Sequence, residues 1–151
     1  NGEPELGITW HELVKEVDAG PIWAESTIAI PAEVTALEMR ARMIEAGRDL
    51  FGTAWQRFIA REFIPRIAKL DNGRVWPSRK PEDGRIEAGW PEQKVRNMVR
   101  ALCSPWPPAS ILMENIWVPV RSISRQHVDN AIIYPTAEGW NIFLLPASTD
   151  P

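Results

Sequence analysis

The stretch GITWHELVKEVDAG (residues 7–20), followed by PIWA (21–24), decides the fold of this 151-residue chain. Residues 8–10 suit a β-strand, because β-branched and aromatic residues are enriched in strands. From Ile22 to Ile30, side chains alternate with a period of two, which indicates a second strand. Asp18 lies in the Asp-Ala-Gly-Pro turn between them, and α/β folds collect their sites at strand ends. The stretch therefore predicts a strand, a turn carrying one carboxylate, and a second strand.

Composition limits the class of protein. With 44% hydrophobic and 25% charged residues, the chain matches a globular domain, or one domain with a small appendage. A net charge of -3 argues against a surface built mainly to hold nucleic acid. Cys103 is the single cysteine, and the two histidines are far apart, so we expect no disulfide and no metal site. We expect a cytoplasmic protein without a membrane span or secretory signal.

A long helix is expected after the two strands. Thr35 and Glu38 form a capping box, which marks a helix start. Apolar residues then recur in steps of three and four, and charged residues take the opposite face. Pro65 should end or kink this helix, because proline removes a hydrogen-bond donor and clashes with the preceding turn. The apolar stripe, which we expect to be core, consists of Leu37, Ala41, Ile44, Phe51, Trp55 and Phe58.

The remaining sequence predicts a loop, a helix and short strands. Residues 65–91 are rich in Gly, Pro and charge and predict a long loop, with regular structure only at Val75 and Trp76. Pro91 opens a second helix. A hairpin turn is expected at residues 137–139. The β-like runs of the tail cover residues 116–123, 131–134 and 140–145.

Each candidate functional residue also has a structural interpretation. Asp18, judged on position alone, fits a turn residue whose side chain binds backbone amides two positions on. His11 and His127 fit hydrogen-bonded structural histidines. The loop from Arg79 to Arg85 either binds an anion through its guanidinium groups or is solvated and held by its own opposite charges. The eight tryptophans fit core stripes or packing beside prolines. Taken singly, these features indicate an α/β domain and no particular chemistry.

In combination, three segments resemble the folate-dependent formyltransferase family. The Gly-Ile-Thr strand and the Asp-Ala-Gly-Pro-Ile loop end at Asp18 are similar to its Thr-Gly-Val-Thr strand and its Asp-Thr-Gly or Asp-Ala-Gly loop. RKPEDGRI (79–86) is similar to its Arg-x-Pro-Glu-Asp-Gly-x-Ile-Asp-Trp segment. NMVRAL (97–102) followed by PWP (105–107) is similar to its Arg-Ala-x-x-Pro-Trp/Tyr-Pro-Gly helix end. The match covers residues 1–108 in the family's order, and the tail only loosely.

The resemblance implies a partial, Rossmann-like α/β fold. Residues 1–108 would be the C-terminal part of a formyltransferase catalytic domain, with two strands, a long helix, a long loop and a second helix. Residues 109–151 would form a small β-rich module. It also implies transfer of a formyl group from 10-formyltetrahydrofolate to a primary amine by an Asn, a His and an Asp, the last matching Asp18. The implied folate contacts are Val14, Lys15, Glu16, Val17 and Asp18, and the implied acceptor contacts are Arg79, Lys80 and Arg85.

The formyl acceptor stays open among sugar-nucleotide amines, methionyl-tRNA and aminoacyl substrates. The acidic chain disfavours tRNA, although a local basic patch would bind it. Such a patch would consist of Arg79, Lys80, Arg85, Arg96 and Arg100.

The sequence also departs from the family's pattern. The family's Asn and His belong to an Asn-x-His-x-Ser-Leu-Leu-Pro-like segment, which would precede the point where this chain begins. Ala88-Gly89-Trp90 replaces Asp-Trp, and Pro108 replaces Gly. We therefore expect no activity from these 151 residues alone. The alternative is a non-catalytic binding or assembly module, whose partner is the missing N-terminal half or another copy of the chain.

Overall fold

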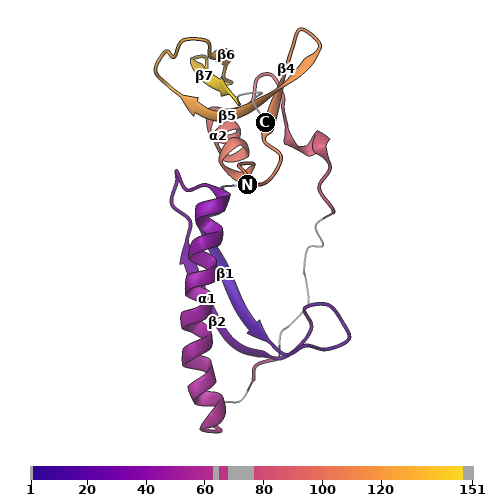
Figure 1. Ribbon diagram of the computed structural model, residues 1–151, viewed down its shortest axis with the longest axis vertical. Coiled ribbons are helices and arrows are strands. Elements are labelled where there is room, and N and C mark those ends of the chain that lie inside the picture. Colours follow the sequence, from indigo (N-terminus) through magenta and orange to yellow (C-terminus); the bar gives the residue numbers. More distant parts are fainter. Residues whose placement is uncertain (1, 63–64, 68–76, 148–151) are drawn as a thin grey trace. The chain divides into compact units, whose positions relative to one another are not determined.

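The computed structural model describes residues 2–62, 65–67 and 77–147 (Figure 1). The contacts divide the chain into two compact units. The hairpin unit comprises Glu3–Pro31 and Glu38–Pro77, and the sheet unit comprises Asn1–Gly2, Ala32–Leu37 and Ser78–Pro151. In the part of the chain described, neither α-helix has the apolar length that a bilayer span requires.

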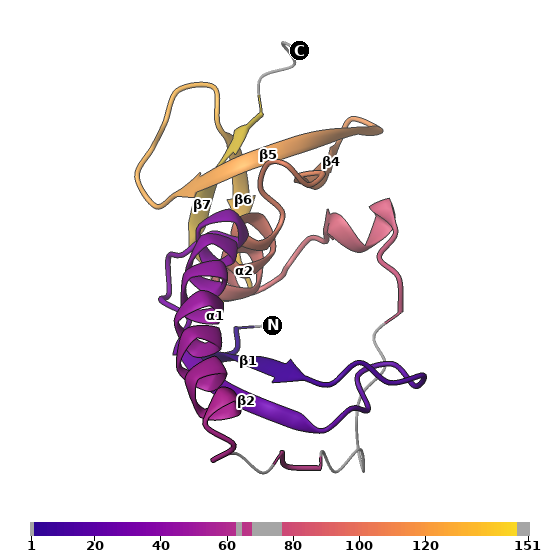
Figure 2. The ribbon, with the colours of Figure 1, turned by 60° about the horizontal axis from the view of Figure 1, so that its bottom comes forward.

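The hairpin unit begins with the two predicted strands. β1 (Glu5–His11) pairs antiparallel with β2 (Ile22–Ala29), and the register shifts between Trp10 and His11. The loop between the strands extends beyond their paired part in both ribbon views (Figures 1 and 2). The predicted strand, turn and strand are therefore confirmed, with Asp18 in the loop.

The long helix α1 (Ala36–Ile59) starts directly after Thr35, as its capping box predicts. The expectation that Pro65 ends it is wrong, because the helix stops six residues earlier. Arg61 has a φ of 56°, and the Glu62 amide donates to the carbonyl oxygen of Arg57 at 3.1 Å. These are features of a Schellman motif, in which a left-handed residue turns the chain out of the helix. An arginine at the left-handed position leaves little sequence signal.

The apolar stripe of α1 is not the buried core that its spacing predicts. Among the described residues of α1, Met39 is the one that is buried. Phe51, Trp55 and Phe58 are each 44–46% exposed. Within the hairpin unit, the ring of Trp10 packs on Phe51 at 4.9 Å and that of Trp23 on Phe58 at 5.0 Å between centroids. A two-stranded sheet is too narrow to cover seven helical turns, so every side chain of the stripe stays partly accessible.

The sheet unit contains a five-stranded sheet in the order β3-β4-β5-β7-β6. β3 is parallel to β4, and the other neighbouring strands are antiparallel. The three expected runs of the tail are confirmed as β5, β6 and β7, with the hairpin turn between the last two. The strands are β3 (Arg85–Ile86), β4 (Ala109–Met113), β5 (Ile116–Ser124), β6 (Ile132–Pro135) and β7 (Asn141–Pro146).

Two of these strands and one short helix are absent from the sequence prediction. β4 was not expected, and the predicted loop at 65–91 contains β3 and the 3₁₀-helix η1 (Pro81–Gly84). A two-residue strand is too short to show a period of two, so only its pairing with β4 reveals it. Val75 and Trp76, where regular structure was expected, lie outside the described residues.

The second helix, α2 (Glu92–Ala101), starts after Pro91 as predicted and covers the sheet. Its residues Val95 and Val99 pack into a buried cluster with strand residues such as Val120, Ile142 and Leu144. The expected boundary at residue 108 therefore does not coincide with a gap in the packing. α2 and β3 precede that boundary, yet they share one core with the strands that follow it.

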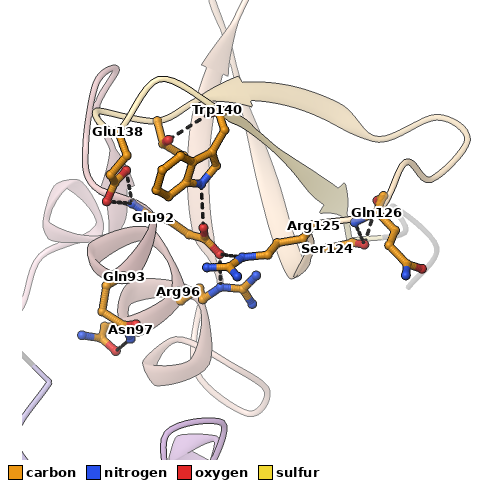
Figure 3. Close-up of polar contacts among 10 residues, drawn as sticks. Glu92, Gln93, Arg96, Asn97, Ser124, Arg125, Gln126, Glu138 and Trp140 are labelled. Atoms are coloured by element: carbon orange, nitrogen blue, oxygen red, sulfur yellow. Dashed lines mark hydrogen bonds and ion pairs between the residues drawn. The ribbon is translucent and has the colours of Figure 1, made fainter.

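Glu92, at the first position of α2, joins three segments of the sheet unit (Figure 3). Its buried carboxylate accepts hydrogen bonds from Arg96 Nε at 2.6 Å, Arg125 Nε at 2.8 Å and Trp140 Nε1 at 2.9 Å. Its backbone amide donates to the Glu138 carboxylate. The hydrogen bond from Arg125 is the largest cause of a pKa lowered from 4.5 to about 2; burial opposes it, and the bonds from Trp140 and Arg96 reinforce it.

We predict that acid weakens the sheet unit between about pH 4.5 and 2. Because folding lowers the pKa of Glu92, the stabilisation is complete above pH 4.5 and is lost as pH falls through the folded pKa. The shift corresponds to about 3 kcal/mol. Urea unfolding across this range, followed by sheet-unit tryptophan fluorescence, measures the effect.

Glu92→Gln should lower the free energy of unfolding at pH 7 by about 3 kcal/mol, because it leaves two arginines without their charge partner. It should also flatten the pH dependence. Glu87→Gln, on an exposed carboxylate of the same unit, is the control. An unchanged acid slope in Glu92→Gln would contradict the assignment.

Candidate active site in the hairpin loop

The loop from Glu12 to Pro21 is closed at its base by backbone contacts. The Glu12 amide donates to the carbonyl oxygen of Pro21 at 2.9 Å. At Gly20, an added Cβ would lie 1.8 Å from the backbone oxygen of Glu12, so only glycine fits there. The glycine of the Asp-Ala-Gly-Pro sequence thus has a steric role, which is to let the two ends of the loop approach.

Asp18 lies in this loop in an unusual backbone conformation. Its φ of 55° is in the left-handed region, which aspartate tolerates better than most residues. Its side chain is 83% exposed, and Oδ1 lies 3.7 Å from Nε2 of His11. Strain at an exposed polar residue is common at functional sites.

His11 is the site residue that sequence reasoning treated as structural. Its Nδ1 lies 3.1 Å from the carbonyl oxygen of Glu12, which can hold the ring with Nδ1 as donor. Nε2 then faces the Asp18 carboxylate at 3.7 Å, which is longer than a direct hydrogen bond. The separation of seven residues between His11 and Asp18 does not predict this contact, because the contact depends on how the loop folds back.

The predicted folate-contacting segment forms the exposed part of the same loop. Val14, Lys15, Glu16 and Val17 are all exposed, and Val17 is 88% accessible. Within the described residues, the amides of this segment make no backbone hydrogen bond. These amide donors are therefore available to a ligand, whereas the Glu16 carbonyl oxygen already accepts from the Ala19 amide at 3.5 Å.

An aromatic cavity of about 180 Å³ opens beside His11. Sequence reasoning assigned the tryptophans to core packing, whereas Trp10 and Trp55 are 42% and 45% exposed. The indole of Trp10 donates to the carbonyl oxygen of Gly47, which holds β1 against α1. The other lining residues are Trp23, Phe51, Ala54 and Phe58.

The three predicted acceptor contacts lie in the sheet unit and do not all come together. Arg79 and Lys80 line one cavity. Arg85 does not line it; its guanidinium stacks on Trp117 at 4.4 Å and lies 3.9 Å from Glu82. Among the described residues, no group of three or more metal-ligating side chains occurs.

Comparison with solved structures relates this geometry to known proteins. HypX from Aquifex aeolicus in complex with tetrahydrofolic acid matches 95% of this chain at 23% identity, with a TM-score of 0.69. WlaRD, a sugar 3N-formyltransferase solved with dTDP and 5-N-formyl-THF, matches 96% at 17% identity and 0.71. The methionyl-tRNA formyltransferase from Clostridium thermocellum matches 97% at 17% identity and 0.62. No model of a known protein family matches the sequence.

These likenesses confirm the partial formyltransferase fold that the sequence predicts. The chain spans 27% of HypX, 56% of WlaRD and 59% of the methionyl-tRNA enzyme. It therefore has the fold of a part of each of these proteins, over less than two thirds of their length.

We predict that Gly20→Ala distorts the loop, because its new Cβ would collide with the Glu12 carbonyl. The free energy of unfolding of the hairpin unit should fall by about 1–3 kcal/mol. Faster exchange of the Glu12 amide hydrogen would report loss of its bond to Pro21. Gly7→Ala is a matched control in the same hairpin, since its Cβ would meet nothing within 4 Å. Equal effects of the two substitutions would refute the steric role of Gly20.

Proposed function

We propose that this chain is part of an N-formyltransferase that moves a formyl group from 10-formyltetrahydrofolate to a primary amine. The observation that carries the proposal is the pair formed by His11 and Asp18, at 3.7 Å, in a loop whose closure requires Gly20. The formyltransferase-like fold supports it, because the neighbours named above share that fold.

The loop fits a folate donor. A pterin ring carries hydrogen-bond donors and acceptors along its edge and two apolar faces. The exposed backbone groups of residues 14–17 can bind the edge, and the accessible side chains of Leu13 and Val17 can cover a face. HypX and WlaRD are themselves solved with folates.

The reaction requires the transfer of one proton. The amine nitrogen must lose a proton when it becomes an amide, and N10 of the donor must gain one. The Asp18 carboxylate lies 3.7 Å from His11 Nε2, and the pair can orient a water molecule that carries this proton. When bound, the donor supplies the activated formyl group. In the family that the sequence resembles, a separate Asn stabilises the oxyanion, and its segment is not among these 151 residues.

The two acceptor contacts that we propose belong to the sheet unit. We propose Arg79 and Lys80 as acceptor contacts, because both are exposed cations lining one cavity. Arg85 is a weaker candidate, since it is already stacked on Trp117. The general class of acceptor is a primary amine, and sugar-nucleotide, methionyl-tRNA and aminoacyl amines all belong to it.

A second candidate function is a non-catalytic binding or assembly module. The half-exposed aromatic residues of the hairpin unit favour it, because covering such an apolar surface lowers the free energy. Its partner would be the missing N-terminal half of the fold or a second copy of the chain. The two functions are separated by the following measurements.

In the complete protein, Asp18→Asn should lower kcat by about 10²-fold, because general acid–base groups commonly contribute this factor. Folate binding should persist, since the loop backbone is unchanged. Asp129→Asn is the matched control: Asp129 lies 3.9 Å from His127 in a second exposed His–Asp pair. Steady-state formyl transfer measures both variants. Full turnover by Asp18→Asn would refute the catalytic role of this carboxylate.

The 151-residue chain alone should show no formyl transfer to a panel of amino sugars, methionyl-tRNA and aminoacyl substrates. The reason is chemical: the oxyanion-stabilising Asn and the second His implied by the resemblance are absent from it. A radioactive formyl-transfer assay checks this expectation. Measurable turnover with any of these amines would show that His11 and Asp18 suffice.

A further inference from the structure

A second cavity of the sheet unit, of about 170 Å³, is lined by three arginines, and we call it the arginine cavity. Arg96 and Arg100 line it from α2, and Arg121 lines it from β5. The segment that precedes α1 contributes Glu33 and Thr35. The other described residues that line it are Val99, Cys103, Ser122 and Ile123. Three separate segments of the sheet unit therefore meet around this cavity.

A β-bulge brings neighbouring residues of β5 to the same cavity. In a regular strand, successive side chains point to opposite faces of the sheet. The pairing of β5 with β7 shifts register between Val120 and Ser122, so Arg121 has no partner in β7. A bulge of this kind bends the strand and redirects a side chain. Arg121 and Ser122 consequently line one cavity, which the strand's period of two does not predict.

The two arginines of α2 are held by contacts of their own. They lie one helical turn apart, and both are half-buried. Arg96 Nε donates to the Glu92 carboxylate at 2.6 Å (Figure 3). Arg100 donates to Asn97 Oδ1 at 3.0 Å and to the Val34 carbonyl oxygen at 3.3 Å. Within the described residues, the two terminal nitrogens of Arg96 have no hydrogen-bond partner, so they can donate to a ligand.

The arginine cavity has an excess of positive charge. Arg121 is exposed and forms no ion pair within the part of the chain that is described. Glu33 is the one acidic residue among the described residues that line the cavity. Glu92 pairs with Arg96 but also with Arg125, so it does not remove the excess. Guanidinium groups gathered around a small space repel one another, and an anion between them relieves this repulsion.

The size of the cavity limits the ligand. Its volume of about 170 Å³ lies below the roughly 300–1,000 Å³ of pockets for drug-sized molecules. A small tetrahedral oxyanion fits it, whereas a whole nucleotide or folate exceeds it. The planar fork of arginine matches the oxygens of a phosphate group, and the Ser122 hydroxyl adds a neutral donor.

We propose that the arginine cavity binds a phosphate group, either as inorganic phosphate or as the terminal group of a phosphate monoester. Arg96, Arg100, Arg121 and the Ser122 hydroxyl supply the donors. Because the cavity joins the segment before α1 to α2 and β5, the bound anion stabilises the sheet unit. Of the basic patch that the sequence predicts for tRNA, Arg96 and Arg100 alone line this cavity. No residue proposed for formyl transfer lines it, so phosphate binding is independent of that activity.

Isothermal titration of the 151-residue chain with inorganic phosphate and with phenyl phosphate tests the proposal. Both should bind saturably at one site, and more weakly as sodium chloride is added, because exposed charges are screened. Tighter binding of phosphate identifies the free ion as the ligand, and tighter binding of phenyl phosphate identifies a monoester. Absence of saturable binding by both would overturn the proposal. So would a short RNA duplex that binds more tightly than either, since the arginines would then belong to a nucleic-acid surface.

Variants assign the site to the cavity. Arg121→Gln should weaken phosphate binding about tenfold, the loss typical of a charge-assisted hydrogen bond, and Arg121 is chosen because Arg96 and Arg100 also hold the fold. Glu33→Gln should strengthen binding about threefold, because it removes a negative charge beside the anion. Arg48→Gln, which alters an exposed arginine outside the cavity, is the matched control. Equal phosphate binding by Arg121→Gln and Arg48→Gln would overturn the proposal.

Cys103 provides a second readout of where the anion binds. It is the single cysteine of the chain, it is half-buried, and it lines the cavity. Phosphate should slow the alkylation of Cys103 by iodoacetamide, a neutral reagent, in proportion to the fraction of chain that has bound the anion. Arg121→Gln should need about tenfold more phosphate for the same protection. An alkylation rate that saturating phosphate leaves unchanged would place the anion outside the cavity and refute the assignment.

Discussion

The carboxylate of Glu92 is the interaction on which the sheet unit depends. It is buried, and it is stable there only because two guanidinium groups and one indole donate to it. These donors come from the helix itself, from the residue after β5 and from the residue before β7. One charge therefore fixes the start of α2 relative to two strands that are distant in sequence. Breaking it would leave charges without partners in a partly buried site, where they are costly.

The two units differ in how much of their apolar surface is buried. The sheet unit closes around a core in which Val95, Val120 and Leu144 are fully buried. The hairpin unit leaves Trp10, Phe51 and Trp55 about half exposed. The loop with His11 and Asp18 belongs to this open unit. An exposed polar loop and an uncovered aromatic face in one unit are consistent with a chain that has the fold of only part of larger proteins.

Local signals in the sequence predicted much of the fold. The alternation after Ile22 and the capping box at Thr35 correctly located β2 and α1, because both patterns reflect contacts between neighbours along the chain. The end of α1 was missed, since the left-handed turn occurs at Arg61 rather than at a glycine. β3 was missed because a strand of two residues is too short to show the alternation that predicts a strand. Its existence depends on pairing with β4, a segment more than twenty residues away.

By itself, the sequence determined most of the helices and strands and the candidate functional residues. These are the carboxylate of Asp18, the glycine that closes its loop, and the cations Arg79 and Lys80. Only the tertiary structure decided which of them meet. It brought His11 to Asp18 through the folding of the loop, stacked Arg85 on Trp117, and lined one cavity with Arg79, Lys80 and Trp106. The physical reason is that helix and strand periods are encoded over a few residues, whereas these encounters depend on register, turns and packing between distant segments.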